Sequence, residues 1–260
     1  MNARDRRREI GHLLHENPVN VDELAAVFSV SASTIRRDLD AMTRSGDVVR
    51  TYGGARTLGG PERSLQERES IAVGQKAAIG KLASSFVEAG AVAVLDAGTT
   101  VGALARNLAH REGVTVVTNG LTTTTVLEHS EGVELIVVGG RLRHISSGFV
   151  GSFAERVMAD VSADVAFLSA DGVSAEHGLC EETPEQASLK RVMVDRAQEL
   201  FVLADATKLG VTSAHWWTRL ERPWSLVTDD TASEEQLAPF RASGLVTVHV
   251  APTSTAPAQP

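Results

Sequence analysis

This chain of 260 residues has one cysteine, few aromatic residues and no long apolar segment. Because Cys180 is the single cysteine, an internal disulfide and a zinc site built from several thiolates are both excluded. No apolar run approaches the roughly 20 residues that a membrane-spanning helix needs. The N-terminus is charged from its first residues, unlike a signal peptide. We therefore expect a cytoplasmic protein without a membrane partner.

Metal and thiolate chemistry also have little support in the sequence. Cys180 stands beside Glu181 and Glu182 in a segment that we expect to be a loop, and neighbouring carboxylates disfavour a thiolate. The histidines after the first hundred residues lack the spacing of metal ligands. They are His110, His129, His144, His177, His215 and His249. We expect no metal, no other cofactor and no catalytic residue.

Charge is distributed unevenly along the chain. The net charge of −8 by itself argues against a nucleic-acid partner. Residues 1–57, however, carry nine arginines and no lysine against eight carboxylates, whereas the remainder carries 16 cations against 25 acidic residues. An arginine-bearing head on an acidic body is a better indication of partners than the net charge.

The chain divides into two folded parts, a connection and a tail. We expect helices over residues 4–16, in "VDELAAVF" and in "ASTIRRDLDAMTRSG", followed by a short hairpin in "DVVRTYGGA". Gly, Pro and charged residues then indicate a linker that includes a connecting helix, and the small, Pro-rich C-terminus is typical of disorder. The predicted parts are a head at 1–57, a linker at 58–74, a body at 75–250 and a disordered tail at 251–260.

Short apolar runs alternate with helix-length segments in the body. The runs are "VAVLDAG", "VTVVTNG", "VELIVVGG", "VAFLSADGV", "ELFVLADA", "WSLVTDD" and "VTVHVA". Valine-rich runs separated by helices indicate strands that are buried on both faces of a mostly parallel sheet. In open parallel sheets, ligands bind outside the carboxyl ends of the strands. The sequence therefore predicts an α/β body whose ligand site lies at the residues that follow the strands.

The head has the pattern of a helix-turn-helix. In the second of its two helices Ile35, Leu39 and Met42 form an apolar stripe, and Ser31 is placed to cap the N-terminus. The opposite face and the hairpin carry cationic and hydroxyl side chains suited to base edges and phosphates. The candidate DNA-binding residues are Ser33, Thr34, Arg36, Arg37, Arg44, Arg50, Tyr52 and Arg56.

Two other interpretations of the head remain open from the sequence. Arg36 and Asp40 are four residues apart, so they can form a surface ion pair that contributes little to stability. A three-helix head on an acidic protein can also be a protein-docking module. The agreement of stripe, cap, turn and Gly-Gly hairpin favours double-stranded DNA as the partner.

The stretch "VLDAGTT" has the pattern of an anion site. Gly98 allows a sharp turn after a strand, and Thr99 and Thr100 begin an amphipathic helix whose free N–H groups favour a phosphate. Asp96 does not bind the phosphate, because like charges repel, but its carboxylate can accept hydrogen bonds from sugar hydroxyls or brace the loop. The alternative is a capped turn that holds no ligand.

Other strand ends carry residues that can complete such a site. Asn119 can both donate to a sugar hydroxyl and accept from it, and Asp171 either turns its loop or binds ligand. Arg141 can neutralise a phosphate or face solvent. Ser147 and Gly148 are expected just before another helix, at a second hydroxyl-binding edge.

The head sequence "VSASTIRRDLDAMTRSGDVVRTYGGA" resembles the winged head of the DeoR family of bacterial transcriptional regulators. "DAGTT", "VVTN", "SADG", "QASLKRVM" and "LADATKLG" resemble the effector domain of that family. The resemblance implies a recognition helix in the major groove, a body with the sheet fold of ribose-5-phosphate isomerases, and a sugar-phosphate effector. It also favours a pocket-facing Lys190 over the solvated lysine that its position alone suggests. Lys208 is a weaker candidate of the same kind.

We therefore expect a repressor of sugar or carbohydrate metabolism genes, a homodimer or homotetramer that a phosphorylated sugar releases from its operator. The alternative is a sugar-phosphate isomerase-like enzyme with an accessory DNA-binding head, in which Asp171 and Lys190 move protons. That enzyme needs a second acid, for which Glu181 and Glu182 are the candidates, and it has no use for a recognition helix. A DNA-binding protein that senses a nucleoside or a free sugar is a third possibility.

Overall fold

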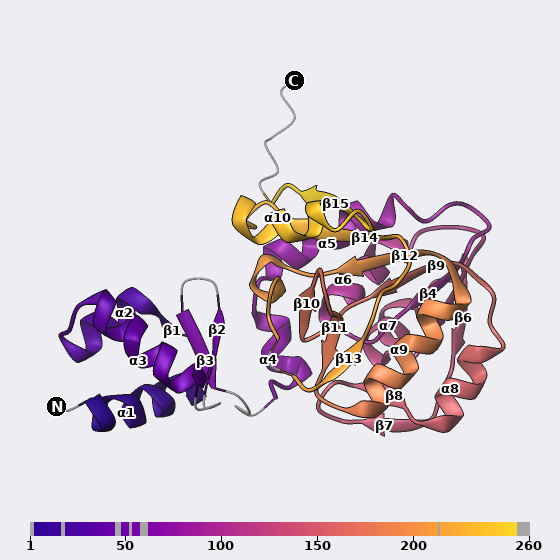
Figure 1. Ribbon diagram of the computed structural model, residues 1–260. Helices are drawn as coiled ribbons and strands as arrows, with labels where there is room; N and C mark the ends of the chain where they lie inside the picture. Colours follow the sequence, from indigo (N-terminus) through magenta and orange to yellow (C-terminus); the bar gives the residue numbers. More distant parts are fainter. Residues whose placement is uncertain are drawn as a thin grey trace.

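The computed structural model describes residues 3–16, 19–44, 48–51, 54–57, 62–212 and 214–253. Figure 1 shows that they form a small head of helices and short strands and a larger body in which helices surround a sheet. The fold class expected from the sequence, a winged helix-turn-helix followed by a mostly parallel α/β body, is confirmed.

The head consists of helices and a small antiparallel sheet. Asn20 and Glu23 form a capping box at the start of α2, in which Asn20 Oδ1 accepts from Glu23 N at 2.8 Å. The sequence predicts the helices and the β2–β3 hairpin but not β1, because two residues are too few to show alternation. The elements are α1 (Ala3–Glu16), β1 (Val19–Asn20), α2 (Val21–Phe28), α3 (Ala32–Arg44), β2 (Val48–Thr51) and β3 (Gly54–Thr57).

Apolar side chains from all the head helices form one core. Ile10 comes from α1, Leu24 from α2, and Ile35, Leu39 and Met42 from α3, and each is at most 5% exposed. The apolar stripe predicted on α3 therefore faces the core. Burial of each such side chain contributes roughly 1.5–3 kcal/mol to the stability of the head. Because this stripe faces the core, the opposite face of α3 is turned toward solvent.

A parallel sheet lies at the centre of the body, and each apolar run predicted from the sequence forms one of its strands. Every neighbouring pair of strands is parallel. The chain runs outward from β4 through β5 and β6, then continues from β9 on the other side of β4, and such a reversal leaves a crevice at the strand ends. In spatial order the strands are β15 (Val246–Ala251), β14 (Trp224–Asp229), β12 (Ala197–Leu203), β9 (Ala163–Leu168), β4 (Val92–Leu95), β5 (Val114–Thr118) and β6 (Val133–Val137).

Alternate residues of the strands contribute to two separate cores, one on each face of the sheet. On β4, Ala93 and Leu95 lie in one core and Val94 lies in the other. Because helices cover both faces, the strands are apolar on both sides, and their sequences read as continuous valine-rich runs. The first core includes residues of α5 (Val73–Ser84), α6 (Thr99–Leu108) and α7 (Leu121–Leu127), and the second includes residues of α8 (Ser152–Ala159), α9 (Pro184–Arg196) and α10 (Glu234–Ala242).

Short strands form two further antiparallel sheets in the body. The sequence does not predict them, since three or four residues show too little alternation. Cys180 accordingly lies buried in a strand, β11, rather than in the expected loop. One sheet comprises β10 (Gly172–Ser174), β11 (Gly178–Glu181) and β13 (Trp216–Thr218), and the other is the hairpin of β7 (Arg141–Arg143) and β8 (Gly148–Val150).

The body extends beyond its predicted C-terminal boundary. Ala251 is the last residue of β15 and is fully buried. Thr253 N donates to Asp230 Oδ2 at 3.0 Å, and Thr253 Oγ1 donates to Asp230 Oδ1 at 2.6 Å. Residues 251–253 therefore belong to the packed body and not to the predicted tail, because β15 pairs with β14 up to its last residue. The rest of that tail, 254–260, lies outside the described residues.

Two kinds of feature are absent from the part of the chain that the structure describes. No helix in that part is long and apolar enough to cross a membrane. No group of three or more His, Cys, Asp or Glu side chains there is arranged to hold a metal ion.

Candidate functional site

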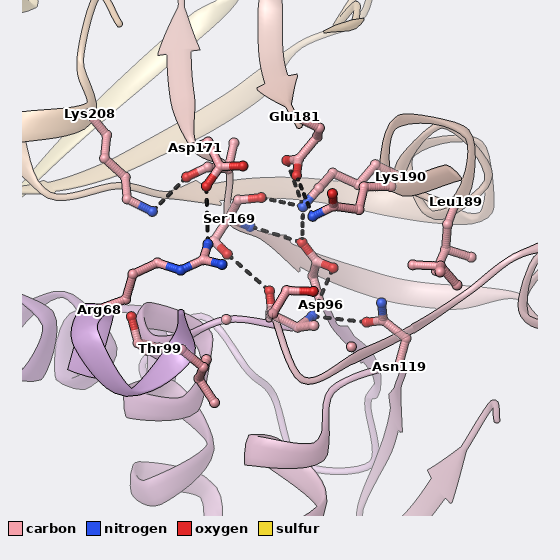
Figure 2. Close-up of a pocket in the computed structure, with 18 residues that line it drawn as sticks. Arg68, Asp96, Thr99, Asn119, Ser169, Asp171, Glu181, Leu189, Lys190 and Lys208 are labelled. Carbon is pink, nitrogen blue, oxygen red and sulfur yellow. Dashed lines mark hydrogen bonds and ion pairs between the residues drawn. The ribbon is translucent and has the colours of Figure 1, made fainter. Parts of the chain in front are cut away.

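A pocket lies where the strand order reverses, at the carboxyl ends of β4 and β9 (Figure 2). Asp96 follows β4 into the pocket, Asn119 follows β5, and Ser169 and Asp171 follow β9. Its position agrees with the general rule for ligand sites in parallel sheets. Its other lining residues include Leu65, Arg68, Ala97, Gly98, Thr99, Ser146, Gly148, Ala170, Glu181, Gln186, Lys190 and Lys208.

A buried cluster of one lysine and two carboxylates forms the floor of this pocket. Lys190 Nζ is ion-paired with Asp96 Oδ2 and, at 3.0 Å, with Glu181 Oε1, and it donates to the carbonyl of Ser169 at 2.5 Å. The three charged residues are at most 5% exposed. α9 carries Lys190 because Thr183 caps that helix by accepting from Gln186 N, with Pro184 in its first turn. The pocket-facing position expected for Lys190 from the family resemblance is the one observed.

The charges of this cluster are set by burial and by mutual attraction. Burial raises the pKa of Glu181 to about 8, although the positive charge of Lys190 opposes the change. Burial also acts to lower the pKa of Lys190, but Asp96 and Glu181 outweigh it and hold that pKa above its ordinary value. Lys190 is therefore charged at neutral pH, and the proton is held more firmly on the Glu181 carboxyl than on an ordinary glutamate.

The loop after β4 is held by its polar neighbours. Ala97 N donates to Asp96 Oδ1 at 2.8 Å and to Asn119 Oδ1 at 2.9 Å. Gly98 has φ of +151°, and a Cβ at this position would lie 2.4 Å from Ser169 Oγ, so only glycine fits. Asp96 and Asn119 thus brace the backbone that leads into α6. Thr99 begins α6 and lines the pocket.

Thr100 differs from Thr99 in its surroundings. It is 1% exposed and does not line the pocket, although it follows Thr99 directly. Its Oγ1 is buried and has no hydrogen-bond partner among the described residues. Of the two predicted threonines, therefore, the structure brings only Thr99 to the site.

The start of β8 closely approaches the loop after β4. A Cβ added to Gly148 would lie 2.8 Å from the Cβ of Ala97, so a larger residue would displace that loop. Ser147 has φ of +50° and does not line the pocket, whereas the neighbouring Ser146 does. The helix predicted after these residues is present as α8 (Ser152–Ala159), but the strand β8 precedes it, because Gly148 pairs with Arg143 in the β7–β8 hairpin.

Arg141 lies outside the pocket. It begins β7, is exposed, and is ion-paired with Glu185 Oε1 at 3.1 Å. This is the solvent-facing alternative considered for it above. The end of a strand fixes where the backbone lies but not where the next side chain points. The short hairpin after β6 directs Arg141 away from the pocket residues.

Arg68 is a pocket residue that the sequence pattern does not indicate. It lies in α4 (Leu65–Ser70), within the segment predicted as a linker, and its Nη1 donates to Asp171 Oδ1 at 3.0 Å. Ser64 and Glu67 form a capping box, which is a sequence signal for a helix start at this point. No local signal shows that this helix packs against the pocket. Glu181, considered above only as an acid of the isomerase-like alternative, is brought to the pocket by β11 from a distant segment, which no local signal shows.

The exposed face of α3 is that expected of a recognition helix. Ser33, Arg36 and Arg37 are exposed and Thr34 is half-buried. Ser31 Oγ accepts from Thr34 N at 3.2 Å, which is the predicted cap. A helix whose exposed residues near the N-terminus are cationic and hydroxyl-bearing is suited to the major groove.

The remaining DNA-binding candidates are located only by their backbone. Arg44 is the last residue of α3, Arg50 lies in β2 and Arg56 lies in β3. Tyr52 lies outside the described residues. Contacts of these four residues with DNA stay a prediction.

A winged helix-turn-helix joined to an α/β body with a polar pocket is the architecture of a transcriptional regulator that senses a small molecule. Residues 6–59 match the family described as "DeoR-like helix-turn-helix domain", and residues 71–230 match the family described as "DeoR C terminal sensor domain". The chain therefore belongs to the DeoR family of transcriptional regulators.

Curated relatives share most of their length with this chain. The chain is 33% identical to the HTH-type transcriptional regulator GolR of Listeria innocua over 244 residues, 93% of this chain and 96% of that protein. It is 32% identical to the HTH-type transcriptional repressor GlcR of Bacillus subtilis over 219 residues, 84% of each chain. These relatives are named as regulators, and the chain is a regulator and not the isomerase-like enzyme considered above.

The solved structures that are similar to this chain include ribose 5-phosphate isomerase A from Methanocaldococcus jannaschii. The similarity covers 51% of this chain and 52% of that chain, at 20% identity and a TM-score of 0.38. A likeness of this size supports no inference about function, which must come from the geometry of the site.

Proposed function

We propose that this regulator is a repressor of sugar or carbohydrate metabolism genes, and that a phosphorylated sugar in the pocket at β4 and β9 releases it from operator DNA. The observation that carries the proposal is the division of this pocket into a side suited to an anion and a side suited to hydroxyl groups. Because its proposed partner is operator DNA, the protein would act in the cytoplasm.

One side of the pocket is suited to phosphate. α6 begins at Thr99, and the N–H groups of its first turn, together with the helix dipole, favour an anion. Lys208 Nζ, which donates to the carbonyl of Ala170 at 2.5 Å, and the Arg68 guanidinium add positive charge to the lining. These groups come from three separate elements, which converge only in the folded body.

The other side is suited to sugar hydroxyls. Asp171 Oδ2 is buried and has no hydrogen-bond partner among the described residues, so it can accept from a hydroxyl. Glu181 also lines the pocket, where its Oε2 accepts from Gln186 Nε2 at 3.1 Å. Asp96 and Asn119 support the proposal by holding the loop between the two sides, and Asn119 Nδ2 itself donates to the carbonyl of Phe149 at 3.2 Å.

DNA release follows if the sugar phosphate binds one conformation better than the other. A homodimer or homotetramer would place two α3 helices on half-sites about one helical turn apart, or a multiple of it. A ligand that favours a conformation with another spacing lowers the affinity for the operator by the same coupling free energy with which DNA lowers the affinity for ligand.

The test uses the full-length protein and a duplex that it selects from a random pool of DNA. Fluorescence anisotropy is measured with pentose 5-phosphates, hexose 6-phosphates, their parent sugars and nucleosides. We expect one phosphate to release the DNA and to stabilise the protein, by about 2.7 kcal/mol at ~100 times its Kd, while its parent sugar does neither. Equal release by the parent sugar or by a nucleoside, or no response to any phosphate, contradicts the proposal.

Thr99→Val tests the position of the phosphate. The change keeps the shape of the side chain and removes one hydroxyl from the pocket, so we expect the phosphate affinity to fall about fivefold to tenfold with no change in DNA affinity. Thr115→Val is the matched control, because Thr115 Oγ1 donates to Glu134 Oε2 at 3.0 Å outside the pocket. Phosphate affinity that is equal in the two variants places the phosphate elsewhere.

A further inference from the structure

The segment that joins the head to the body forms part of the pocket wall. α4 lies between the two family matches, which end at residue 59 and begin at residue 71. Leu65 and Arg68 of α4 nevertheless line the pocket, and Leu65 N donates to the carbonyl of Ile145 at 2.8 Å. The connection is therefore packed on the body and is in contact with the space where a ligand would bind.

Arg68 stands at the centre of a chain of ion pairs. Its Nη1 donates to Asp171 Oδ1 at 3.0 Å, and its Nη2 donates to Glu62 Oε1 at 3.0 Å (Figure 2 shows the contact with Asp171). Glu62 also accepts from Arg143 Nη1 at 2.7 Å, and a second contact joins the same two side chains. The Nε of Arg68 is buried and has no hydrogen-bond partner within the described ranges.

A buried lysine holds the carboxyl end of α4. Lys76 of α5 is 5% exposed, and its Nζ donates to the carbonyls of Arg68 and Ile71 at 2.5 and 2.8 Å. Burial, and then repulsion by Lys208, lower its pKa to about 8. Cationic side chains from α4, α5 and the segment after β12 thus lie near one another. A bound anion would reduce the repulsion between them.

We propose that Arg68 binds the phosphate of the effector directly and gives up Asp171 and Glu62 in exchange, and that this exchange moves α4 and so transmits occupancy of the pocket to the head. The inference rests on the proposed function, and it adds the residue and the route. A guanidinium offers a planar fork that matches phosphate oxygens in pairs, and the unpaired Nε supplies a further donor. Asp171, once released, is free to accept from a sugar hydroxyl.

The route to the head is short. β3 ends at Thr57 and α4 begins at Leu65, so residues 58–64 make the whole connection. Fully extended, they span at most about 25 Å. A connection of this length limits how far α4 can move without moving the head. Arg68 lies one helical turn from the start of α4. A change in its ion-pair partners would therefore move the end of α4 that is joined to the connection.

The experiment compares Arg68→Ala and Arg68→Lys with the wild-type full chain. The probes are inorganic phosphate, pentose 5-phosphates and hexose 6-phosphates, measured by calorimetry and by anisotropy on the selected duplex. We expect Arg68→Ala to bind the responsive phosphate at least tenfold more weakly and to stay on DNA in its presence. Arg68→Lys keeps the charge without the fork and should lie between the two. Arg241→Ala, which removes an exposed arginine paired with Glu234 on α10, should match the wild type.

Glu62→Gln keeps the proposal testable if Arg68→Ala does not fold. Glu62 does not line the pocket, but it competes for Arg68. Weakening that competition should tighten phosphate binding about threefold or more. Hydrogen exchange of residues 65–70 in the wild type should also change when the phosphate is added, and an unchanged exchange rate overturns the route through α4.

The outcomes separate this inference from the proposed function. If no phosphate stabilises the wild type or releases its DNA, both are overturned. If the wild type responds and Arg68→Ala responds with the same affinity and the same release, only the role of Arg68 is overturned. If Arg68→Ala binds phosphate weakly but is released normally at saturation, Arg68 is a ligand and the transmission through it is overturned.

Discussion

The head and the body assemble their functional side chains in different ways. In the head, Ser33, Arg36 and Arg37 lie on the exposed face of one helix, α3, so helical periodicity alone brings them together. In the body, the pocket is made by the residues after β4, β5 and β9, by β11, by α9 and by α4. A surface on one helix depends on that helix, whereas a pocket made from several segments depends on the packing of all of them.

The largest expected effect is confined to the head. Replacing Arg36 and Arg37 by alanine removes two guanidinium groups, each able to contribute about 1–3 kcal/mol of base discrimination, and should weaken specific DNA binding about a thousandfold. The body should melt as in the wild type, because neither arginine is part of a core. Anisotropy at constant salt measures the first effect and a thermal melt measures the second.

The control for this variant changes the same net charge elsewhere. Arg219 and Arg241 are exposed on the body, and replacing both by alanine should leave DNA affinity within about threefold of the wild type. A comparable loss in this control would mean that DNA binding responds to total charge. Sequence-specific binding retained by the head variant would remove α3 from the role of recognition helix.

The second effect is on the stability of the body. Lys190→Met leaves Asp96 and Glu181 buried without their cation, and this should lower the free energy of unfolding by about 3–5 kcal/mol. Urea unfolding measures the change. Lys81→Met on the exposed side of α5 is the control, expected within ~0.5 kcal/mol of the wild type. Equal stability of the two variants would mean that Lys190 does not hold the carboxylates together.

The third effect is on the pH dependence of stability. The pKa of Glu181 is about 8 in the folded protein and 4.5 ordinarily, so between these values the folded state binds more protons than the unfolded state. Stability from this group is complete below pH 4.5 and is lost as the pH rises through 8. Glu181→Gln should therefore flatten the fall in stability over this range relative to the wild type.

Glu185, which is half-buried at the surface, provides the control for the pH measurement. Glu185→Gln removes a carboxylate that is paired with Arg141 at the surface, and its stability should follow the pH dependence of the wild type. If both variants or neither changes the slope between pH 4.5 and 8, the buried Glu181 is not its source. The comparison shows whether the pH dependence of stability comes from the buried cluster in the body or from surface charge.

Elements with a strong local pattern are predictable from the sequence. "VDELAAVF" is the whole of α2, and the cap that begins this helix lies within four residues of its partner. The strands of the large sheet are equally evident, because burial on both faces makes them continuously apolar. The residues that follow β4, β5 and β9 are the part of the site that this pattern reaches.

Residues that enter the pocket from elsewhere are not predictable in this way. Arg68 and Asp171 are 103 residues apart, and Lys190 and Asp96 are 94 apart. No periodicity connects such positions, so a capping box reveals α4 but not its neighbour. The same limit places Arg141 and Ser147 outside the pocket, since a hairpin of three-residue strands decides their direction.

The sequence by itself determined a recognition helix in the head, the strands of the body and the edge of the sheet at which a ligand would bind, because these depend on repeats of a few residues. Only the tertiary structure decided that Glu181 and Lys190 share a buried floor with Asp96, and that Arg68 joins the connection to the pocket. Ion pairs between distant segments form only after the strands have packed. The partners in these ion pairs are therefore determined by the topology of the fold, and no single segment of the sequence specifies that topology.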